Sequence, residues 1–102
     1  MDEPGVSMTV TRVAVDIGMT NIDVAVESGG DVRFQMIENQ HGEAADQVRQ
    51  ALAWLGDDLV PGMTIGVTGG RYRDLPEVLD SFSLQKVDEM KALGLGGLAL
   101  TA

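Results

Sequence analysis

The sequence predicts a mixed α/β domain in which three antiparallel strands come first and helices then alternate with further strands. Two observations carry this prediction. The hydrophobic residues of the first forty positions follow strand periodicity, whereas from residue 44 onward they recur at helical spacing. The chain of 102 residues is also long enough for one hydrophobic core. We therefore expect a single lobe over residues 11–102, preceded by a disordered leader at residues 1–10.

Three strands are expected before residue 40. Residues 12–17 form a nearly continuous apolar run, which is typical of a central strand covered on both faces. The hydrophobic residues of 22–26 alternate with polar ones and predict a half-buried second strand. A Ser-Gly-Gly-Asp turn at residues 28–31 then leads to a third alternating strand over residues 32–36. Together these strands make an antiparallel meander.

The rest of the chain alternates between helix and strand. The expected elements are helices at residues 44–55 and 75–79, strands at 64–67 and 82–87, and a last, glycine-weakened helix from Asp88. The order is β-β-β-α-β-α-β-α, and crossover connections would add the later strands parallel to the first. The predicted sheet order is third, second, first, fourth, fifth. We expect its centre to hold Val13, Val15, Ile65 and Val67.

Composition excludes several classes of function. The chain has 16 acidic residues against seven Lys or Arg, a net charge of −9 that repels nucleic acid and anionic membranes. It has no cysteine and one histidine, which disfavours disulfides and zinc sites. No apolar run approaches the roughly 20 residues of a membrane span. The opening residues 1–7 lack the apolar segment of a signal peptide, so a cytoplasmic location is expected.

The predicted element order is the ribonuclease H-like layout. Two such lobes facing each other make the actin, sugar kinase and Hsp70 superfamily, whose first β-hairpin carries Asp-x-Gly-x-Thr and cradles nucleotide phosphates. Residues 16–20 of this chain read Asp-Ile-Gly-Met-Thr, between a buried strand and an alternating strand. The alternative reading is that Asp16, Gly18 and Thr20 are ordinary hairpin residues and that Asp16 caps a turn.

From Val13 to about Leu100 the chain resembles the N-terminal part of type II pantothenate kinases. The similar segments are residues 15–20, 67–70 (Val-Thr-Gly-Gly) and 87–90 (Val-Asp-Glu-Met). The resemblance implies ATP-dependent phosphorylation of pantothenate by a two-lobed enzyme, with Mg²⁺. It also implies that Glu89 is the general base, that Asp16 holds the metal through water, and that Gly18 and Thr20 line the phosphates.

The loop Thr68-Gly69-Gly70-Arg71 is the candidate substrate-side segment. It follows a predicted parallel strand, at the edge where ligands bind in open α/β sheets, and its small residues permit close approach to an anion. The alternative is an ordinary connection between strand and helix. The first turn of a helix would hold Glu89 ionised, although acids favour that position for the dipole alone, and Asp88 is interpreted as its solvated or capping neighbour.

Two positions depart from the kinase pattern and keep other functions open. Met19 stands where the family has a second glycine, and Asp23 stands where it has a lysine. An acid at the second position is more similar to the hydantoinase and oxoprolinase relatives, which predicts an ATP-dependent hydrolase as the first alternative. The second alternative is a non-catalytic lobe that binds a partner. In each case a second lobe or a second copy of the chain is the expected partner.

Overall fold

The computed structural model describes residues 10–29, 31–56, 59–70, 72–92 and 97–101. These residues form a mixed α/β structure with one six-stranded mixed sheet, one α-helix and a separate two-stranded sheet. The strands are β1 (Val10–Ile17), β2 (Asn21–Ser28), β3 (Asp31–Glu38), β4 (Thr64–Gly69), β5 (Val78–Leu79), β6 (Phe82–Lys86), β7 (Glu89–Ala92) and β8 (Leu98–Thr101). The helix α1 spans Ala44–Leu55, and a 3-10 turn, η2, spans Tyr72–Asp74.

The strand order of the large sheet is β3-β2-β1-β4-β6-β5. Strand β1 is interior, antiparallel to β2 and parallel to β4, and β4 is parallel to β6. The side chains of Val13, Val15, Ile65 and Val67 are buried in its centre, as predicted. Because β1, β4 and β6 run in the same direction, their carboxyl ends meet at one edge of the sheet. The three segments singled out in the sequence follow these three strand ends.

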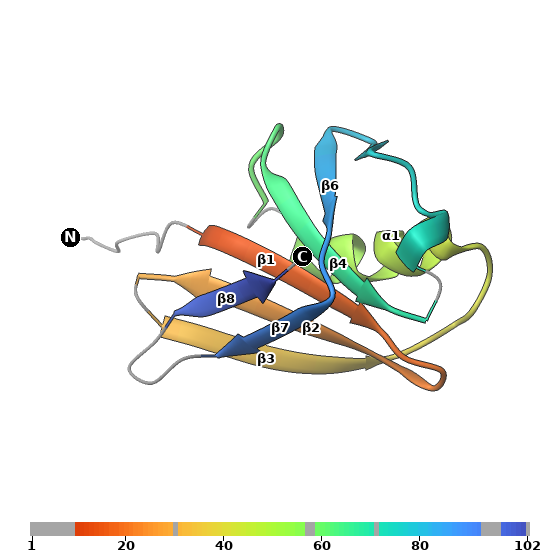
Figure 1. Cartoon of the computed structure of the whole chain (residues 1–102), viewed down its shortest axis with the longest axis horizontal. Helices are drawn as coiled ribbons and strands as arrows, with labels where there is room; N and C mark the ends of the chain where they lie inside the picture. Colours follow the sequence, from red (N-terminus) through yellow and green to blue (C-terminus); the bar gives the residue numbers. More distant parts are fainter. Residues whose placement is uncertain (1–9, 30, 57–58, 71, 93–96, 102) are drawn as a thin grey trace.

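Two layers cover the sheet on opposite faces. Figure 1 shows the hairpin of β7 and β8 in front of the β1–β3 part of the sheet, and α1 behind β1 and β4. The helix packs Val48, Ala51 and Leu52 against the valines and isoleucines of β1, β2 and β4. On the other face, Leu98 packs on two alanines, Ala14 and Ala25. Small residues on that face allow the short hairpin β7–β8 to lie close to the sheet.

Helix α1 begins and ends where the sequence predicts. Its first turn is fixed by Asp46, whose Oδ2 accepts a hydrogen bond from the Glu43 N–H at 3.2 Å. Gly56 ends it, with φ of 59°, and donates its N–H to the Leu52 carbonyl. Most apolar residues of the helix are buried against the sheet, which is the physical reason for its periodicity, whereas Trp54 near its end is 45% exposed.

The two other predicted helices are wrong. Residues 75–77 are irregular and lead into β5, because Pro76 cannot donate a helical hydrogen bond and the Glu77 carbonyl instead accepts from Leu84 N–H at 2.8 Å. The segment that follows Asp88 is the hairpin β7–β8 rather than a helix. Leu98 and Leu100 have the period of a strand and face the sheet. The extra strand β5 makes the sheet six-stranded rather than five-stranded.

The expected leader of residues 1–10 overlaps strand β1 by one residue. Residues 1–9 lie outside the described residues. Val10, which was predicted to belong to the leader, is instead buried and lies in β1 opposite Ser28. Its side chain joins the main core, which explains why the strand begins there.

Candidate functional site

The candidate site lies at the carboxyl ends of β1, β4 and β6. Asp16 of β1 lies beside Thr68 of β4 in the parallel register. The chain leaving β6 continues this row, because Val87 N–H donates to the Val67 carbonyl at 2.9 Å and Thr68 Oγ1 donates to the Asp88 carbonyl at 3.3 Å. The structure therefore brings the three predicted segments to one edge of the sheet.

Asp16 and Gly69 are in direct contact at this edge. Gly69 has φ of 97°, and a Cβ built on it would stand 2.5 Å from Asp16 Oδ1 and 2.5 Å from the Ile17 carbonyl oxygen. The next residue, Gly70, is also fixed to β1, because its N–H donates a hydrogen bond to the Ile17 carbonyl at 2.8 Å. Glycine at position 69 is thus required by the packing of the loop against β1, whether or not a ligand binds.

The surroundings of the Asp16 carboxyl group disfavour its charged form. Burial raises its pKa above the ordinary 3.8, and the charge of Asp23 raises the pKa further. Asp23 lies directly opposite on β2. Within the described residues, no side chain or backbone group donates a hydrogen bond to the Asp16 carboxylate. Such a half-buried acid favours a proton or a cation beside it.

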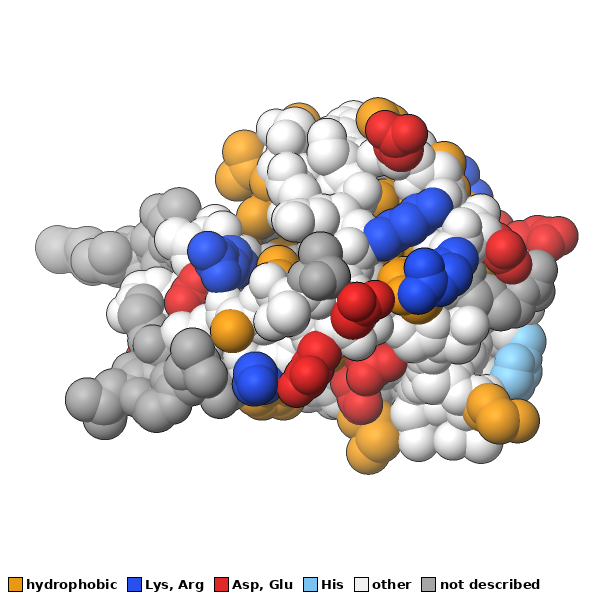
Figure 2. All heavy atoms as spheres, viewed as in Figure 1, with side chains coloured by type: hydrophobic (Ala, Val, Ile, Leu, Met, Phe, Trp, Pro, Cys, Tyr) orange, Lys and Arg blue, Asp and Glu red, His pale blue; other side chains and the backbone are white. Residues whose placement is uncertain are grey.

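A cavity of about 370 Å³ adjoins this pair of acids. Its wall is formed by β3 and β7 in addition to the two aspartates, with apolar side chains and one lysine: Phe34, Met36, Met90 and Lys91. Figure 2 shows acidic side chains gathered near the middle of this face, with basic side chains close by. The site combines negative charge with an apolar rim.

The hairpin of residues 18–20 connects β1 to β2. Gly18 N–H donates to the Asn21 carbonyl at 2.9 Å, and a Cβ on Gly18 would stand 2.7 Å from that oxygen. The tight turn itself therefore requires this glycine. Thr20 Oγ1 accepts a hydrogen bond from Asn21 Nδ2 at 3.2 Å, and the side chain of Met19 at the tip is exposed.

Asn39, which the sequence analysis missed, fixes this hairpin from below. Its side-chain amide donates to the Gly18 carbonyl and to Gln47 Oε1, both at 2.8 Å, and its backbone N–H donates to the Thr20 carbonyl at 2.9 Å. Its Oδ1 accepts from His41 N–H at 2.7 Å. The only sequence signal was an asparagine between a strand and a helix start, which is typical of any loop.

Glu89 does not open a helix, so the helix dipole gives it no support. It begins β7 opposite Thr101, with an exposed carboxylate whose Oε2 lies 3.5 Å from Lys91 Nζ. The neighbouring Asp88, expected to be a solvated or capping residue, contacts two other side chains. It accepts a hydrogen bond from Tyr72 Oη at 2.9 Å and lies 3.8 Å from the Arg73 guanidinium. Arg71, the remaining predicted site residue, lies outside the described residues.

Protein-family models, curated proteins and solved structures were all compared with this chain. None of them matches it. Within the described part of the chain, no helix is long and apolar enough to cross a membrane. The same residues contain no group of three or more His, Cys, Asp or Glu side chains arranged to hold a metal ion.

Proposed function

We propose that this chain is a ribonuclease H-like lobe that holds the phosphates of Mg-ATP in a two-lobed kinase acting on pantothenate. One observation supports this most: Asp16, the hairpin of residues 18–20 and the loop of residues 68–70 converge at the carboxyl ends of adjacent parallel strands. In open α/β sheets, ligands bind in the crevice at that edge. The choice of pantothenate rests on the sequence resemblance.

Asp16 has the chemistry for a magnesium ion held through water. Magnesium in phosphoryl-transfer sites is bound by one or two carboxylates with waters and substrate phosphates, so a cluster of three protein ligands is not required. Asp16 and Asp23 lie directly opposite each other, and burial together with the charge of Asp23 raises the pKa of Asp16. When bound, the ion neutralises charge on the phosphate oxygens.

The remaining residues would act mainly by positioning. Gly18 and Thr20 would line the phosphates from a turn whose geometry is fixed by Asn39. Glu89 follows Asp88 at the end of the same row and would accept the proton of the substrate hydroxyl. The loop of residues 68–70, with Arg71 after it, would face the anionic part of the substrate. Catalysis of phosphoryl transfer consists largely of such positioning and charge stabilisation.

A second candidate is an ATP-dependent hydrolase similar to the hydantoinases and oxoprolinases. The observation that favours it is the pairing of Asp23 with Asp16 across β1 and β2, because a kinase of the type II family carries a lysine at that place. A second carboxylate there changes the charge of the phosphate side from positive to negative. The two candidates differ in the substrate that couples to ATP consumption.

The test begins with the 102-residue chain alone. Calorimetry with Mg-ATP should show weak or no binding, since half of the nucleotide contacts would come from a second lobe and the net charge of −9 repels a polyanion. Micromolar binding would contradict this arrangement. The second lobe is then supplied, from a longer reading frame or a partner chain, and ATP consumption is measured with pantothenate or with a cyclic amide.

Pantothenate-dependent turnover supports the kinase, and cyclic-amide-dependent turnover supports the hydrolase. In an active kinase, Glu89→Gln should lower kcat about 10²- to 10⁴-fold with little change in KM, as expected for loss of a general base. Asp88→Asn is the matched control and should be mild. Near-normal turnover of Glu89→Gln would overturn its assignment as the base. An assembly with neither activity would leave the lobe as a non-catalytic module.

A further inference from the structure

Strand β3 forms one edge of the large sheet and pairs only with β2 among the described residues. Its sequence, Asp-Val-Arg-Phe-Gln-Met-Ile-Glu, contains neither proline nor lysine. Those residues are the usual protection of an edge strand against pairing with another chain. Charged side chains also protect such edges, and β3 has one charge in its interior, Arg33; the rest of this eight-residue edge is a template for a further strand.

The register shows which backbone groups of β3 are free. Ser28 and Asp31 flank a two-residue turn, and the pair next to such a turn is hydrogen-bonded. Since hydrogen-bonded pairs alternate along antiparallel strands, the N–H and C=O groups of Val32, Phe34 and Met36 point away from β2. The Met36 carbonyl is consistent with this, because it accepts a hydrogen bond from the exposed Gln35 side chain at 3.1 Å, a contact that a pairing strand would displace.

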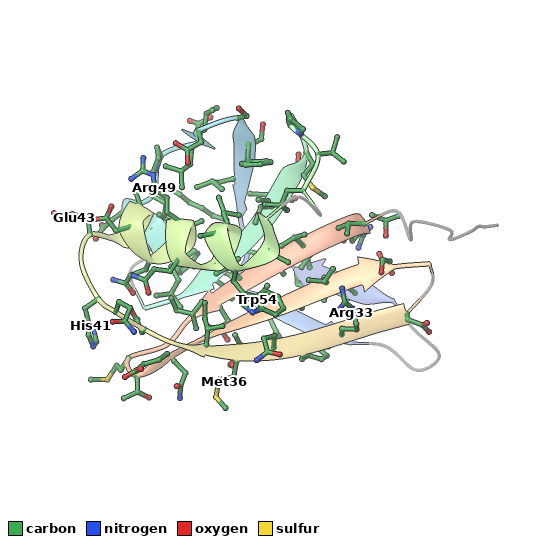
Figure 3. The ribbon with its side chains drawn as sticks, turned by 180° about the vertical axis from the view of Figure 1, so that it is seen from behind. Arg33, Met36, His41, Glu43, Arg49 and Trp54 are labelled. Atoms are coloured by element: carbon green, nitrogen blue, oxygen red, sulfur yellow. The ribbon has the colours of Figure 1, made fainter. Side chains whose placement is uncertain are left out.

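The same residues carry the exposed apolar side chains of this edge. Phe34 is 55% exposed and Met36 is 59% exposed, on the face that also holds β7. On the opposite face, Trp54 of α1 lines a cavity together with Arg33, Phe34 and Gln35. Figure 3 shows Trp54 and Arg33 over β3, and Met36 projecting from it. The outer side of β3 thus combines free backbone groups with unburied hydrophobic surface.

We propose that β3 pairs antiparallel with the β3 of a second copy of this chain, about a two-fold axis at Phe34. Phe34 then faces Phe34 of the second copy, and Val32 faces Met36 of the second copy. All of these residues have outward backbone groups, so the ladder and the apolar face continue across both copies. Such a self-complementary contact is the interface of a closed dimer.

The sequence of β3 favours this register and this occupant. The apolar residues of the face that holds β7, Val32 and Met36, are placed symmetrically about Phe34; on the other face Ile37 lies opposite Asp31, and no two like charges lie directly opposite each other. An axis at Arg33 would place two arginines face to face, and an axis at Gln35 would place Val32 opposite Glu38 on the face that holds β7, where the axis at Phe34 pairs apolar residues with one another. A foreign strand would have no reason to share this symmetry. The charge of −9 on each copy opposes association, so the dimer should strengthen as salt is added.

The first test is sedimentation equilibrium of the whole chain over a range of concentration and salt. We expect a monomer–dimer equilibrium, accompanied by a change in fluorescence of Trp54, the single tryptophan. Phe34→Lys should weaken the dimer at least about tenfold, since it places two like charges opposite each other. Val78→Lys, at an exposed apolar position on the other edge strand, is the matched control and should leave the equilibrium unchanged.

The second test determines the register by disulfide cross-linking. Each variant carries a single cysteine, because the parent chain has none. Phe34→Cys should form a disulfide-linked dimer, because opposed residues of a hydrogen-bonded pair have Cα atoms about 5.5 Å apart, within disulfide reach. Met36→Cys alone should not link, since the two copies of residue 36 would be about 13 Å apart. Mixing Val32→Cys with Met36→Cys should link the two variants, with Phe34 intact.

Several results would overturn the proposal. A chain that stays monomeric at all concentrations and salt levels has no such interface. Cross-linking of Met36→Cys at the rate of Phe34→Cys would indicate random collision rather than a fixed register. Efficient linking of Gln35→Cys would place the axis elsewhere. Growth into species larger than a dimer would indicate an open contact instead of a closed one. Melting temperatures of every variant separate these outcomes from loss of folding.

Discussion

The carboxylate of Asp16 and the α-carbon of Gly69 touch across the parallel strands β1 and β4. A Cβ on Gly69 would stand 2.5 Å from Asp16 Oδ1, closer than real side chains approach. The register explains the contact, because Ile17 pairs with Gly69 one residue after Asp16. Two motifs separated by some fifty residues are therefore one physical unit. A substitution in either motif should therefore disturb the conformation of the other.

Replacing Gly69 by Ala should destabilise the fold strongly. The new methyl group would clash with Asp16 and with the Ile17 backbone, and φ of 97° is itself unfavourable for alanine. We expect the free energy of unfolding to fall by at least about 2 kcal/mol. The control is Gly62→Ala, where φ is 90° but nothing lies within 4 Å, with an expected loss of about 1 kcal/mol. Urea unfolding of both variants measures the difference, and equal losses would disprove the clash.

Replacing Asp16 by Asn should stabilise the chain near neutral pH. Burial and the Asp23 charge raise the pKa of Asp16 in the folded state, so between its unfolded and folded pKa values the folded protein binds more protons. The contribution of this group to the free energy of unfolding therefore falls as pH rises through the folded pKa. The Asn side chain does not titrate, so the variant does not lose this free energy. Its higher free energy of unfolding relative to the parent should disappear below the ordinary pKa of 3.8.

The comparison needs unfolding curves of both proteins across the acid and neutral range. Asp23→Asn should recover a smaller part of the stability, because it lowers the pKa of Asp16 by removing only the lesser of the two causes. If Asp16→Asn destabilises the chain equally at every pH, the carboxylate makes a favourable contact in the folded state, and burial and Asp23 do not raise its pKa.

Local patterns predicted the meander, α1 and the central strands, because each depends on near neighbours in the sequence. The run of residues 12–17 is apolar on both faces and became the interior strand β1. Residues 44–55, whose apolar positions have helical spacing, form α1, which ends at the C-cap residue Gly56. The parallel edge that gathers Asp16 and Thr68 follows from these elements, since crossover connections align the strands in one direction.

The errors fall where tertiary contacts decide. The segment from Glu89 has acids and alanine at positions that suit a helix start. It instead forms a hairpin, because Leu98 and Leu100 pack on the alanines of the sheet and β8 pairs with the strand that Glu89 begins. Asn39 was missed for a related reason. Its role depends on Gly18 and Gln47, which lie 21 and 8 residues away, and no local pattern reveals that a loop asparagine is buried.

Tyr72 offers a direct check of the contacts around Asp88. The hydrogen bond to Asp88, partial burial and the Asp88 charge raise the pKa of this phenol, while Arg73 lowers it. Asp88→Ala should therefore lower the pKa of Tyr72, and Arg73→Ala should raise it. Tyr72 is the only tyrosine, so phenolate absorbance during a pH titration reports it alone. Identical titrations for both variants and the parent would show that the three side chains do not meet in solution.

Replacing Asn39 by Asp should loosen the hairpin of residues 18–20 while changing almost no volume. The acid can still accept from His41 N–H, but an oxygen replaces the amide that donates to the Gly18 carbonyl and to Gln47 Oε1. Because Asn39 is only 5% exposed, water cannot relieve this opposition of acceptors. We expect the free energy of unfolding to fall by about 1–3 kcal/mol at neutral pH.

Two readouts separate a loosened hairpin from a general loss of stability. Amide hydrogen exchange at Gly18, whose N–H donates to the Asn21 carbonyl, should accelerate more than exchange at Val67 in the centre of the sheet. The difference in stability from the parent should also shrink in acid, because a protonated carboxyl can again donate a hydrogen bond. Gln50→Glu makes the same chemical change on α1, where the amide that donates to the His41 carbonyl is open to solvent. It should cost less than about 1 kcal/mol. If Asn39→Asp costs no more than Gln50→Glu and leaves exchange at Gly18 unaltered, the hairpin is fixed by its own turn, and Asn39 does not position it.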